Sequence, residues 1–308
     1  MKHIQGKIYL LGAFSLAGTS VITGRILSMK LSSFTITAIS LGMVLVFLLP
    51  FYGSKTLKTI HLLAKSDWVM ILFQAVFGIF LFRTFLLFGV RLTNTVEAGI
   101  LTGTTPAITS LMAFFFLKER LSGITVLGIG FTVTGIILLQ GTDLLSAQFS
   151  DGHLAGNTLI ICAAVSESAF NIISRKHKVE AKDVSKVQLD PVVQTLLVSA
   201  IALLLSIVPA ICERPLTSLS TIGWEEWFAL VWYGLVVTAL AFIFFYEGAK
   251  RCDAYVIAAF SGMIPLVSML LSIILLREKI GYNQCIGGFL IILSMALIGK
   301  REKVEPIT

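Results

Sequence analysis

The chain has 308 residues, of which 56% are hydrophobic and 13% are charged, and its mean hydropathy is +0.92. Soluble globular proteins are about 45–50% apolar and about 25% charged, so the composition excludes an ordinary soluble domain and indicates a membrane protein. The formal net charge is +7, which we interpret as positive charge retained on cytoplasmic loops rather than as a nucleic-acid-binding surface. The four cysteines have no CxxC spacing and are interpreted as small apolar side chains.

Ten apolar segments follow one another along the chain, and each is long enough to cross a bilayer core as a helix of about 20 residues. The first segment follows Lys2, His3 and Lys7, and we interpret it as a span rather than a signal peptide because no small-residue cleavage site follows it. The loops are short, and no soluble domain is expected. The segments cover residues 8–27, 33–52, 68–90, 94–117, 122–140, 154–174, 189–211, 224–248, 254–276 and 281–299.

The chain contains an internal repeat. Residues 67–140 lie on residues 226–299 without a gap when they are shifted by 159 positions. Segments 2 and 7 keep this shift, whereas segments 1 and 6 match at a shift of 150, so five helices repeat as five helices. The matched pairs include Gly89 with Gly248, Gly103 with Gly262, Pro106 with Pro265, Ser40 with Ser199, and Arg25 with Arg175.

Five is an odd number, so the second half must cross the membrane in the opposite sense from the first. We therefore predict an all-α integral membrane protein with ten transmembrane helices in a 5+5 inverted repeat, an arrangement typical of secondary transporters. The expected units are residues 1–141, residues 154–300 and a cytoplasmic tail at 301–308.

The distribution of Lys and Arg predicts the orientation. If both termini are cytoplasmic, the cytoplasmic side carries 17 of these residues, the other side carries six, and Arg83 lies inside a span. Since positive residues are retained in the cytoplasm, this bias favours a multi-pass protein of the cell membrane with both termini inside.

Several motifs stand at matching places in the two halves. The first half has Glu97-Ala98-Gly99-Ile100, Thr104-Thr105-Pro106-Ala107 and Leu117-Lys118-Glu119-Arg120-Leu121, and the second has Ser261-Gly262-Met263-Ile264-Pro265 and Leu276-Arg277-Glu278-Lys279. With the ten-helix plan, these motifs resemble the drug/metabolite transporter superfamily, and specifically its EamA-type permeases. The resemblance covers nearly the whole chain.

The resemblance implies export of amino acids, nucleobases, drugs or other metabolites through a central cavity lined by helices 1, 3, 4, 6, 8 and 9. Many members carry a Trp-Gly pair in helix 1 and an aromatic residue at the matching place in helix 6. This chain has Ala17-Gly18 and Glu167-Ser168 there instead, so an aromatic platform is not expected at those positions.

Glu167 lies about two-thirds of the way through segment 6, among small and apolar residues. A central charge costs at least about 2.5 kcal/mol on insertion scales, so Glu167 should face the protein interior or a cavity. Asn171 shares its helix face one turn later. Burial disfavours the charged form of a carboxyl group, which makes proton exchange near neutrality a reasonable function. The alternative is a neutral, hydrogen-bonded Glu that holds helices together.

Pro106 and Pro265 lie near the middle of segments 4 and 9 and predict paired kinks at the membrane midplane. Thr102 and Ser261 lie beside them and could bond the freed backbone groups; we expect both to face a central space. The alternative interpretation is helix bending for packing alone.

Arg83 lies inside segment 3, and Glu97 lies near the start of segment 4. The two could pair as a gate or bind the charged groups of a substrate; a structural ion pair or extension of the side chain into the headgroups is the alternative. Tyr233 and Phe260 could also line the cavity, although aromatic residues commonly serve packing. Small residues such as Gly128, Gly135 and Gly287 suit internal helix packing or a homodimer face.

The favoured function is a secondary transporter that works by alternating access, with proton-linked or facilitated efflux of a small organic metabolite or drug. Glu167 is the leading candidate for a proton-carrying residue. A non-transporting membrane sensor or assembly protein is the alternative. An intramembrane enzyme is disfavoured because all four histidines are expected in loops or tails, no HExxH motif is present, and no Ser–His pair is expected within the spans. No P-loop motif is present either, so ATP is not expected to drive the protein directly. The expected partners are the small-molecule substrate and the lipid bilayer, without a metal, a cofactor or nucleic acid.

Overall fold

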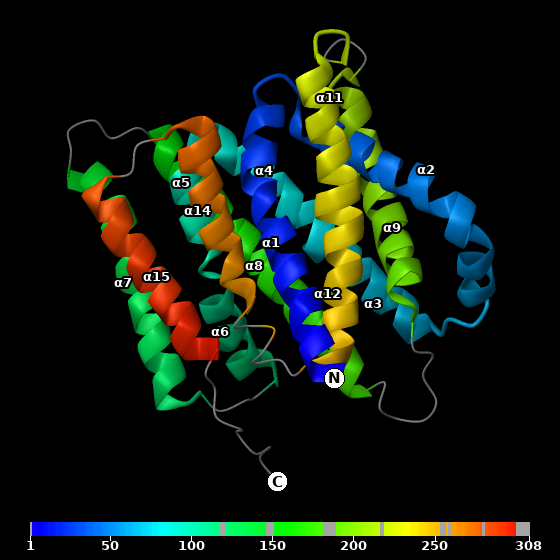
Figure 1. Ribbon diagram of the computed structural model, residues 1–308, viewed down its shortest axis with the longest axis horizontal. Coiled ribbons are helices and arrows are strands. Elements are labelled where there is room, and N and C mark those ends of the chain that lie inside the picture. The colour runs from blue at the N-terminus through cyan, green and yellow to red at the C-terminus, as the bar shows by residue number, and fades with distance from the viewer. Residues whose placement is uncertain are drawn as a thin grey trace.

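The computed structural model describes residues 2–117, 121–145, 151–180, 189–215, 219–252, 257, 260–278 and 281–299. Every regular element within these ranges is a helix, and the helices pack side by side (Figure 1). The first half contains α1 (Lys2–Ser28), α2 (Ser33–Ile60), α3 (Lys65–Ala75), η1 (Val76–Leu81), α4 (Phe82–Leu92), α5 (Thr95–Thr102), α6 (Thr105–Leu117) and α7 (Gly123–Leu145). The second half contains α8 (Asp151–Glu180), α9 (Pro191–Cys212), α11 (Trp224–Val231), η2 (Trp232–Leu240), α12 (Ala241–Arg251), α14 (Met263–Leu276) and α15 (Tyr282–Gly299).

The predicted ten-span architecture is confirmed. Seven helical stretches are long and apolar enough to cross a membrane, and three shorter apolar helices occupy segments 5, 9 and 10. The third span runs without a turn from α3 through η1 into α4, and the eighth runs in the same way from α11 through η2 into α12. The chain is therefore an all-helical, multi-pass membrane protein.

The contacts between the halves follow the repeat. Helix α1 packs against α12 and α14, which belong to the third and fourth spans of the second half. Helix α8 packs against α4, α5 and α6, which belong to the third and fourth spans of the first half. Each half thus places its first helix between two spans of the other half, as an inverted repeat requires.

The remaining spans pair with their own repeat partners. Helix α7 lies along α15 at one edge of the molecule, and α2 lies along α9 at the other edge (Figure 1). A Cβ atom on Gly135 of α7 would lie 2.8 Å from the carbonyl oxygen of Gly287 on α15. Thr132 and Ser294 also bond across this pair at 2.6 Å. These small residues therefore serve a close helix contact inside the molecule.

One glycine pair illustrates how the halves approach each other. A Cβ atom on Gly89 of α4 would lie 2.6 Å from the Ile160 side chain of α8, and one on Gly248 of α12 would lie 2.7 Å from the Leu10 side chain of α1. Gly89 and Gly248 are repeat partners. Both crossings between a first and a third span thus depend on a residue without a side chain.

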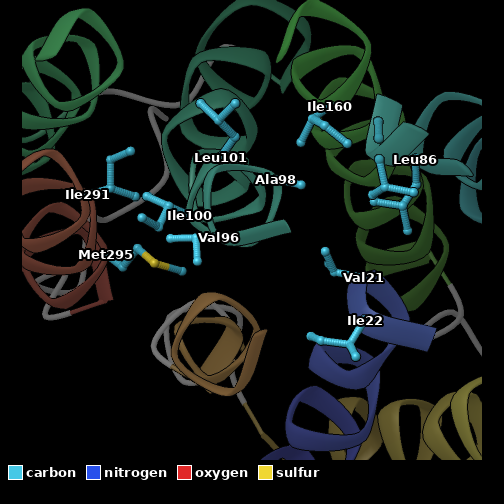
Figure 2. Close-up of a cluster of buried hydrophobic side chains, with 12 residues drawn as sticks. Val21, Ile22, Leu86, Val96, Ala98, Ile100, Leu101, Ile160, Ile291 and Met295 are labelled. Atoms are coloured by element: carbon cyan, nitrogen blue, oxygen red, sulfur yellow. The ribbon is translucent and has the colours of Figure 1, made fainter. Parts of the chain in front are cut away.

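A buried apolar cluster joins the two halves. It combines side chains from α1, α4, α5, α8 and α15, including Val21, Leu86, Ile100, Ile160 and Ile291, each at most 1% exposed. Figure 2 shows these residues and their neighbours arranged around a common centre. Moving apolar side chains from lipid into a helix contact provides no hydrophobic driving force, because lipid tails are equally apolar. Close packing in this cluster and the polar contacts described below therefore hold the helices together.

Candidate functional site

A central cavity of about 90 Å³ lies between spans of both halves. The residues that line it come from α1, η1, α4, α5, α8, η2, α12 and α14. Its polar and charged lining consists of Ser20, Arg83, Thr102, Glu167, Asn171 and Tyr233. Its apolar lining consists of Ala13, Phe14, Ala17, Gly78, Phe82, Phe170, Val237, Ala241, Phe242, Phe245 and Ile264. The cavity therefore combines aromatic walls with a few polar groups, as small-molecule sites commonly do.

The repeat places matching residues on opposite walls of this cavity. Gly78, Phe82 and Arg83 correspond to Val237, Ala241 and Phe242 at the 159-residue shift, and all six line the cavity. The charges break this symmetry, because the residue of the second half that corresponds to Arg83 is the uncharged Phe242. Glu167 breaks it as well, since its partner Ala17 also lines the cavity. Each half thus contributes one charged residue that the other half lacks.

Two π-helical segments border the cavity at matching places. Segment η1 at residues 76–81 corresponds to residues 235–240 of η2. Thr238 donates a 2.7 Å hydrogen bond to the carbonyl oxygen of Tyr233, five residues earlier, in the π-helical register. Such wide turns are rare and frequently occur at functional sites, because they redirect side chains within one continuous helix.

Arg83 is buried, with only 4% of its surface exposed. Its guanidinium donates hydrogen bonds to Ser40 Oγ at 2.8 Å and to Thr238 Oγ1, and it lies 4.4 Å from the centre of the Tyr233 ring. In the described part of the chain, no carboxylate forms an ion pair with it. The cation is therefore held by hydroxyl groups and a ring face, which leaves room for an anion.

The Tyr233 hydroxyl adds a second available group beside Arg83. Tyr233 is 1% exposed, and its hydroxyl has no hydrogen-bond partner among the described residues. A buried hydroxyl without a partner costs free energy, roughly 1–3 kcal/mol, unless a ligand or water supplies the bond. Arg83 and Tyr233 together can therefore receive an oxygen-bearing group of a ligand.

Glu167, on α8, lines the same cavity and is half-buried. Its Oε2 atom accepts a 3.0 Å hydrogen bond from Thr105 Oγ1, and Asn171 lines the cavity one turn further along α8. The carboxyl group thus keeps one oxygen for a ligand or a proton. This position matches the expectation that Glu167 and Asn171 face a central space.

The two prolines follow interruptions of their helices rather than bending continuous ones. Helix α5 ends at Thr102 and α6 begins at Thr105, so Pro106 lies in the first turn of α6, where a missing amide hydrogen is tolerated. Pro265 likewise lies in the first turn of α14. A Cβ atom on Gly103 would lie 3.2 Å from the Pro265 ring, so the two interruptions face each other.

The remaining residues expected at the cavity lie in different surroundings. Thr102 lines the cavity and donates to the Gly99 carbonyl oxygen at 2.6 Å. Ser261 is buried, but neither it nor Phe260 is part of the lining. Phe260 packs against the apolar cluster around Leu10 and Phe14, which adjoins the cavity through Phe14. Only Thr102 among these three could contact a ligand in the cavity.

Glu97 lies away from both Arg83 and the cavity, so the expected pairing of the two is wrong. The Glu97 carboxylate accepts hydrogen bonds from Asn94 Nδ2 at 2.8 Å, Asn157 Nδ2 at 3.0 Å and Gln284 Nε2 at 2.8 Å. His153 Nε2 lies 3.5 Å from it, in the first turn of α8 rather than in a loop. The carboxylate is satisfied locally because α5 begins beside α8 and α15, which supply Asn157 and Gln284. The sequence therefore indicated a buried acid correctly but assigned it to the wrong site.

Several residues of the cavity are missing from the sequence-based set. Phe170, Phe242 and Phe245 form its aromatic wall, and Ser40 and Thr238 hold Arg83. The repeat contained one indication that Phe242 lines the cavity, because Phe242 corresponds to Arg83 of the first half. The described residues contain no group of three or more His, Cys, Asp or Glu side chains that could hold a metal ion.

The sequence profile of the EamA-like transporter family matches this chain at residues 4–140 and again at residues 154–300. The chain is 29% identical over 295 residues to the "Uncharacterized transporter YetK" of Bacillus subtilis, covering 93% of this chain and 84% of that protein. It is also 26% identical over 200 residues to the "Aromatic amino acid exporter YddG" of Ancylobacter novellus, covering 64% of each chain.

A solved crystal structure shares the fold, with a TM-score of 0.63 and 20% sequence identity over 95% of each chain. The matching family is a family of transporters and not of enzymes. The two profile matches also coincide with the five-helix repeats that the helix contacts relate. The chain is therefore a membrane transporter and belongs to the EamA-like transporter family.

Proposed function

We propose that this transporter exports a small organic solute from the cell by alternating access, without ATP, and that Glu167 exchanges the coupled proton. The observation that carries the proposal is the central cavity, which both halves line and which contains one acid and one base without an ion pair between them. An inverted repeat supports two related conformations around such a fixed site.

The lining favours a substrate with an anionic group and an apolar body. Arg83 and the Tyr233 hydroxyl can bind a carboxylate, because neither has an acidic partner among the residues described. A guanidinium prefers planar oxyanions that accept two hydrogen bonds. Phe170, Phe242 and Phe245 would then contact the apolar part of the substrate.

Glu167 extends this argument to a second charged group. An ammonium group could bind its carboxylate while the carboxylate of the same molecule binds Arg83. An amino acid with an aromatic or large apolar side chain has all three groups: a carboxylate for Arg83, an ammonium for Glu167 and an apolar part for the phenylalanine side chains. The similarity to the aromatic amino acid exporter of Ancylobacter novellus supports the same class.

Proton coupling follows from competition for Glu167. A proton on the carboxyl group would remove the charge that attracts an ammonium, so proton and substrate would occupy the site alternately. The site would release the substrate on one side of the membrane and return with a proton. The 17-to-6 distribution of Lys and Arg supports a cytoplasmic position for both termini of a protein in the cell membrane.

The alternative is a membrane sensor or assembly protein that binds the same solute without moving it. A cavity alone does not separate these functions, because both require binding. Transport by the purified protein does separate them.

The test uses purified protein in two stages. A thermal-shift screen compares amino acids, nucleobases and cationic drugs, since a ligand at 100 times its Kd stabilises the folded state by about 2.7 kcal/mol. Counterflow of the best ligand is then measured in proteoliposomes. Stabilisation by aromatic amino acids together with counterflow supports the proposal. Binding without counterflow supports the sensor, and stabilisation by cationic drugs alone contradicts the substrate class.

A further inference from the structure

A second hollow, separate from the central cavity, lies at the side of the molecule where α1 and α4 end, opposite the N-terminus (Figure 1). We call it the distal basic pocket; it has a volume of about 460 Å³, and its lining includes Arg25, Ser28, Lys30, Ser32 and Arg91. Three of the residues that line it are cations, and none is an acid.

The two arginines are fixed in place by a reciprocal pair of backbone contacts. Arg25, in the last turn of α1, donates to the carbonyl oxygen of Val90, and Arg91, in the last turn of α4, donates to the carbonyl oxygen of Leu31. Capping helix ends in this way uses one hydrogen-bond donor of each guanidinium and leaves the others. Backbone contacts therefore hold both arginines in place, whereas Lys30 is an exposed side chain.

The neighbouring acids are already engaged. Lys30 forms a 2.6 Å ion pair with Glu226, so its charge is partly compensated. Glu213 accepts from the backbone amides of Phe34 and Thr35, at 3.3 and 2.7 Å, and from the Thr35 hydroxyl. Within the described ranges, neither Arg25 nor Arg91 forms an ion pair with a carboxylate.

Two buried polar atoms at the pocket also have no partner. Ser28 Oγ and Arg91 Nε are both enclosed, and neither forms a hydrogen bond within the described structure. A buried donor normally has a partner, from protein, water or ligand. An oxyanion with two or more oxygens could bond both atoms and offset the charge of the two guanidinium groups.

An apolar layer separates this pocket from the central cavity. Leu27, Leu31 and Leu87 pack with Tyr233, which lines the central cavity, in one buried cluster. Arg83 and Arg91 are eight residues apart on α4, which places them about 12 Å apart along the helix axis. A ligand in the distal basic pocket would therefore not touch Arg83.

We propose that the distal basic pocket is a binding site for an oxyanion, either a phosphate or a carboxylate group. The anion comes from an acidic phospholipid headgroup at the membrane surface or from a soluble anion in the surrounding water. The site goes beyond the transport function proposed above, and it binds whether or not the central cavity is occupied.

The experiment measures Tm of the full-length purified protein in two arms. The soluble arm compares inorganic phosphate with chloride at equal ionic strength in uncharged detergent. The lipid arm compares nanodiscs of phosphatidylcholine with nanodiscs that also contain phosphatidylglycerol. A site of this kind predicts a rise in Tm of about 2 °C or more in at least one arm. The rise in phosphate alone identifies a soluble anion, and a rise in phosphatidylglycerol alone identifies a lipid headgroup.

Two variants at Ser28 test whether the rise in Tm caused by the anion arises at the distal basic pocket, and they leave the two arginine contacts in place. Ser28→Ala removes only a hydroxyl that has no partner among the described residues, and it should weaken anion binding by about two- to tenfold. Ser28→Asp places a carboxylate inside the pocket, so it should raise Tm without added anion and abolish the effect of the anion. Arg91→Gln should abolish the effect as well, if the variant folds.

Matched controls are available on both faces of the molecule. Ser220→Asp adds the same charge to the loop before α11 on the same face, and Lys58→Gln removes a positive charge near the end of α2 on the opposite face. Both should keep the response of the wild type. The proposal is overturned if neither arm raises Tm, if the controls lose the response, or if Ser28→Asp lowers Tm.

Discussion

Ser168 Oγ of α8 donates a 3.1 Å hydrogen bond to the backbone carbonyl oxygen of Thr105, the first residue of α6. The repeat partners of these residues are Gly18 and Ile264, and a Cβ atom on Gly18 would lie 2.9 Å from the Ile264 carbonyl oxygen. The first helix of each half therefore rests on the backbone of the other half at the point where a helix is interrupted. The inverted repeat is visible at the level of single atoms.

Gly18→Ala should destabilise the protein. The added methyl group would meet both the Ile264 carbonyl oxygen and the Val267 side chain at 2.9 Å, and overpacking of this kind costs about 1–3 kcal/mol. Gly130→Ala is the matched control, because a Cβ atom there meets nothing within 4 Å. Thermal unfolding in one detergent measures both. Equal Tm values for the two variants would contradict the close contact.

The sequence predicted the architecture well because membrane helices leave strong signals. Length, hydropathy and the 159-residue repeat depend on the chain alone, so ten helices and the inverted halves follow from counting. The charge of Arg83 and Glu167 also indicated residues inside the molecule, since a membrane span tolerates such groups only where they are sheltered.

The partners of those residues could not be predicted in the same way. Whether Glu97 reaches Arg83 depends on the level at which α5 begins, and Asn157 and Gln284 lie 60 and 187 residues away in sequence. The π-helical segments have no distinctive amino-acid composition, so the position of Phe242 in the cavity lining could not be predicted from the sequence. Periodicity assumes 3.6 residues per turn, and a wide turn shifts every later side chain around the helix.

Glu97→Gln should lower stability without altering the central cavity. The substituted amide would bring an NH₂ group towards the donors of Asn94, Asn157 and Gln284, so at least one buried bond is lost at a cost of about 1–3 kcal/mol. Glu225→Gln, on an exposed residue in the first turn of α11, should change stability by less than about 0.5 kcal/mol. Thermal unfolding compares them, and substrate affinity per folded molecule should stay at the wild-type value in both.

Tyr233→Phe should weaken substrate binding while leaving the fold intact. Its hydroxyl has no partner within the described structure, so its loss does not break a protein bond. A hydrogen bond to the substrate would be lost, which corresponds to about a two- to tenfold rise in Kd. Tyr246→Phe is the control, because its hydroxyl is also buried without a partner but Tyr246 does not line the cavity. Equal Kd values for the two variants would place the substrate elsewhere.

The orientation is tested with reporters on opposite faces. A fluorescent protein fused after Lys303 should fold and fluoresce, because the positive charge distribution places this end in the cytoplasm. An alkaline phosphatase fused after Thr221, in the loop before α11, should be active because the same charge distribution predicts that this loop is external. The exchanged pair of fusions should be silent. The reverse pattern would require the opposite orientation and would contradict the positive-inside assignment.

Glu167→Gln should remove the dependence of transport on the pH gradient. The substitution mimics the protonated carboxyl group and keeps an oxygen that can accept the Thr105 hydrogen bond, so the fold should be retained. In proteoliposomes with an acidic interior, the wild type should accumulate substrate as protons leave, whereas Glu167→Gln should only equilibrate it. Glu247→Gln is the matched control, since Glu247 lies in the last turn of α12, paired with Arg251 and outside the cavity lining. If wild type and Glu167→Gln accumulate substrate equally, Glu167 holds helices together and the coupled proton binds elsewhere. If neither responds to the gradient, the protein is a uniporter or uses another ion, and the proton proposal fails while the family assignment stands.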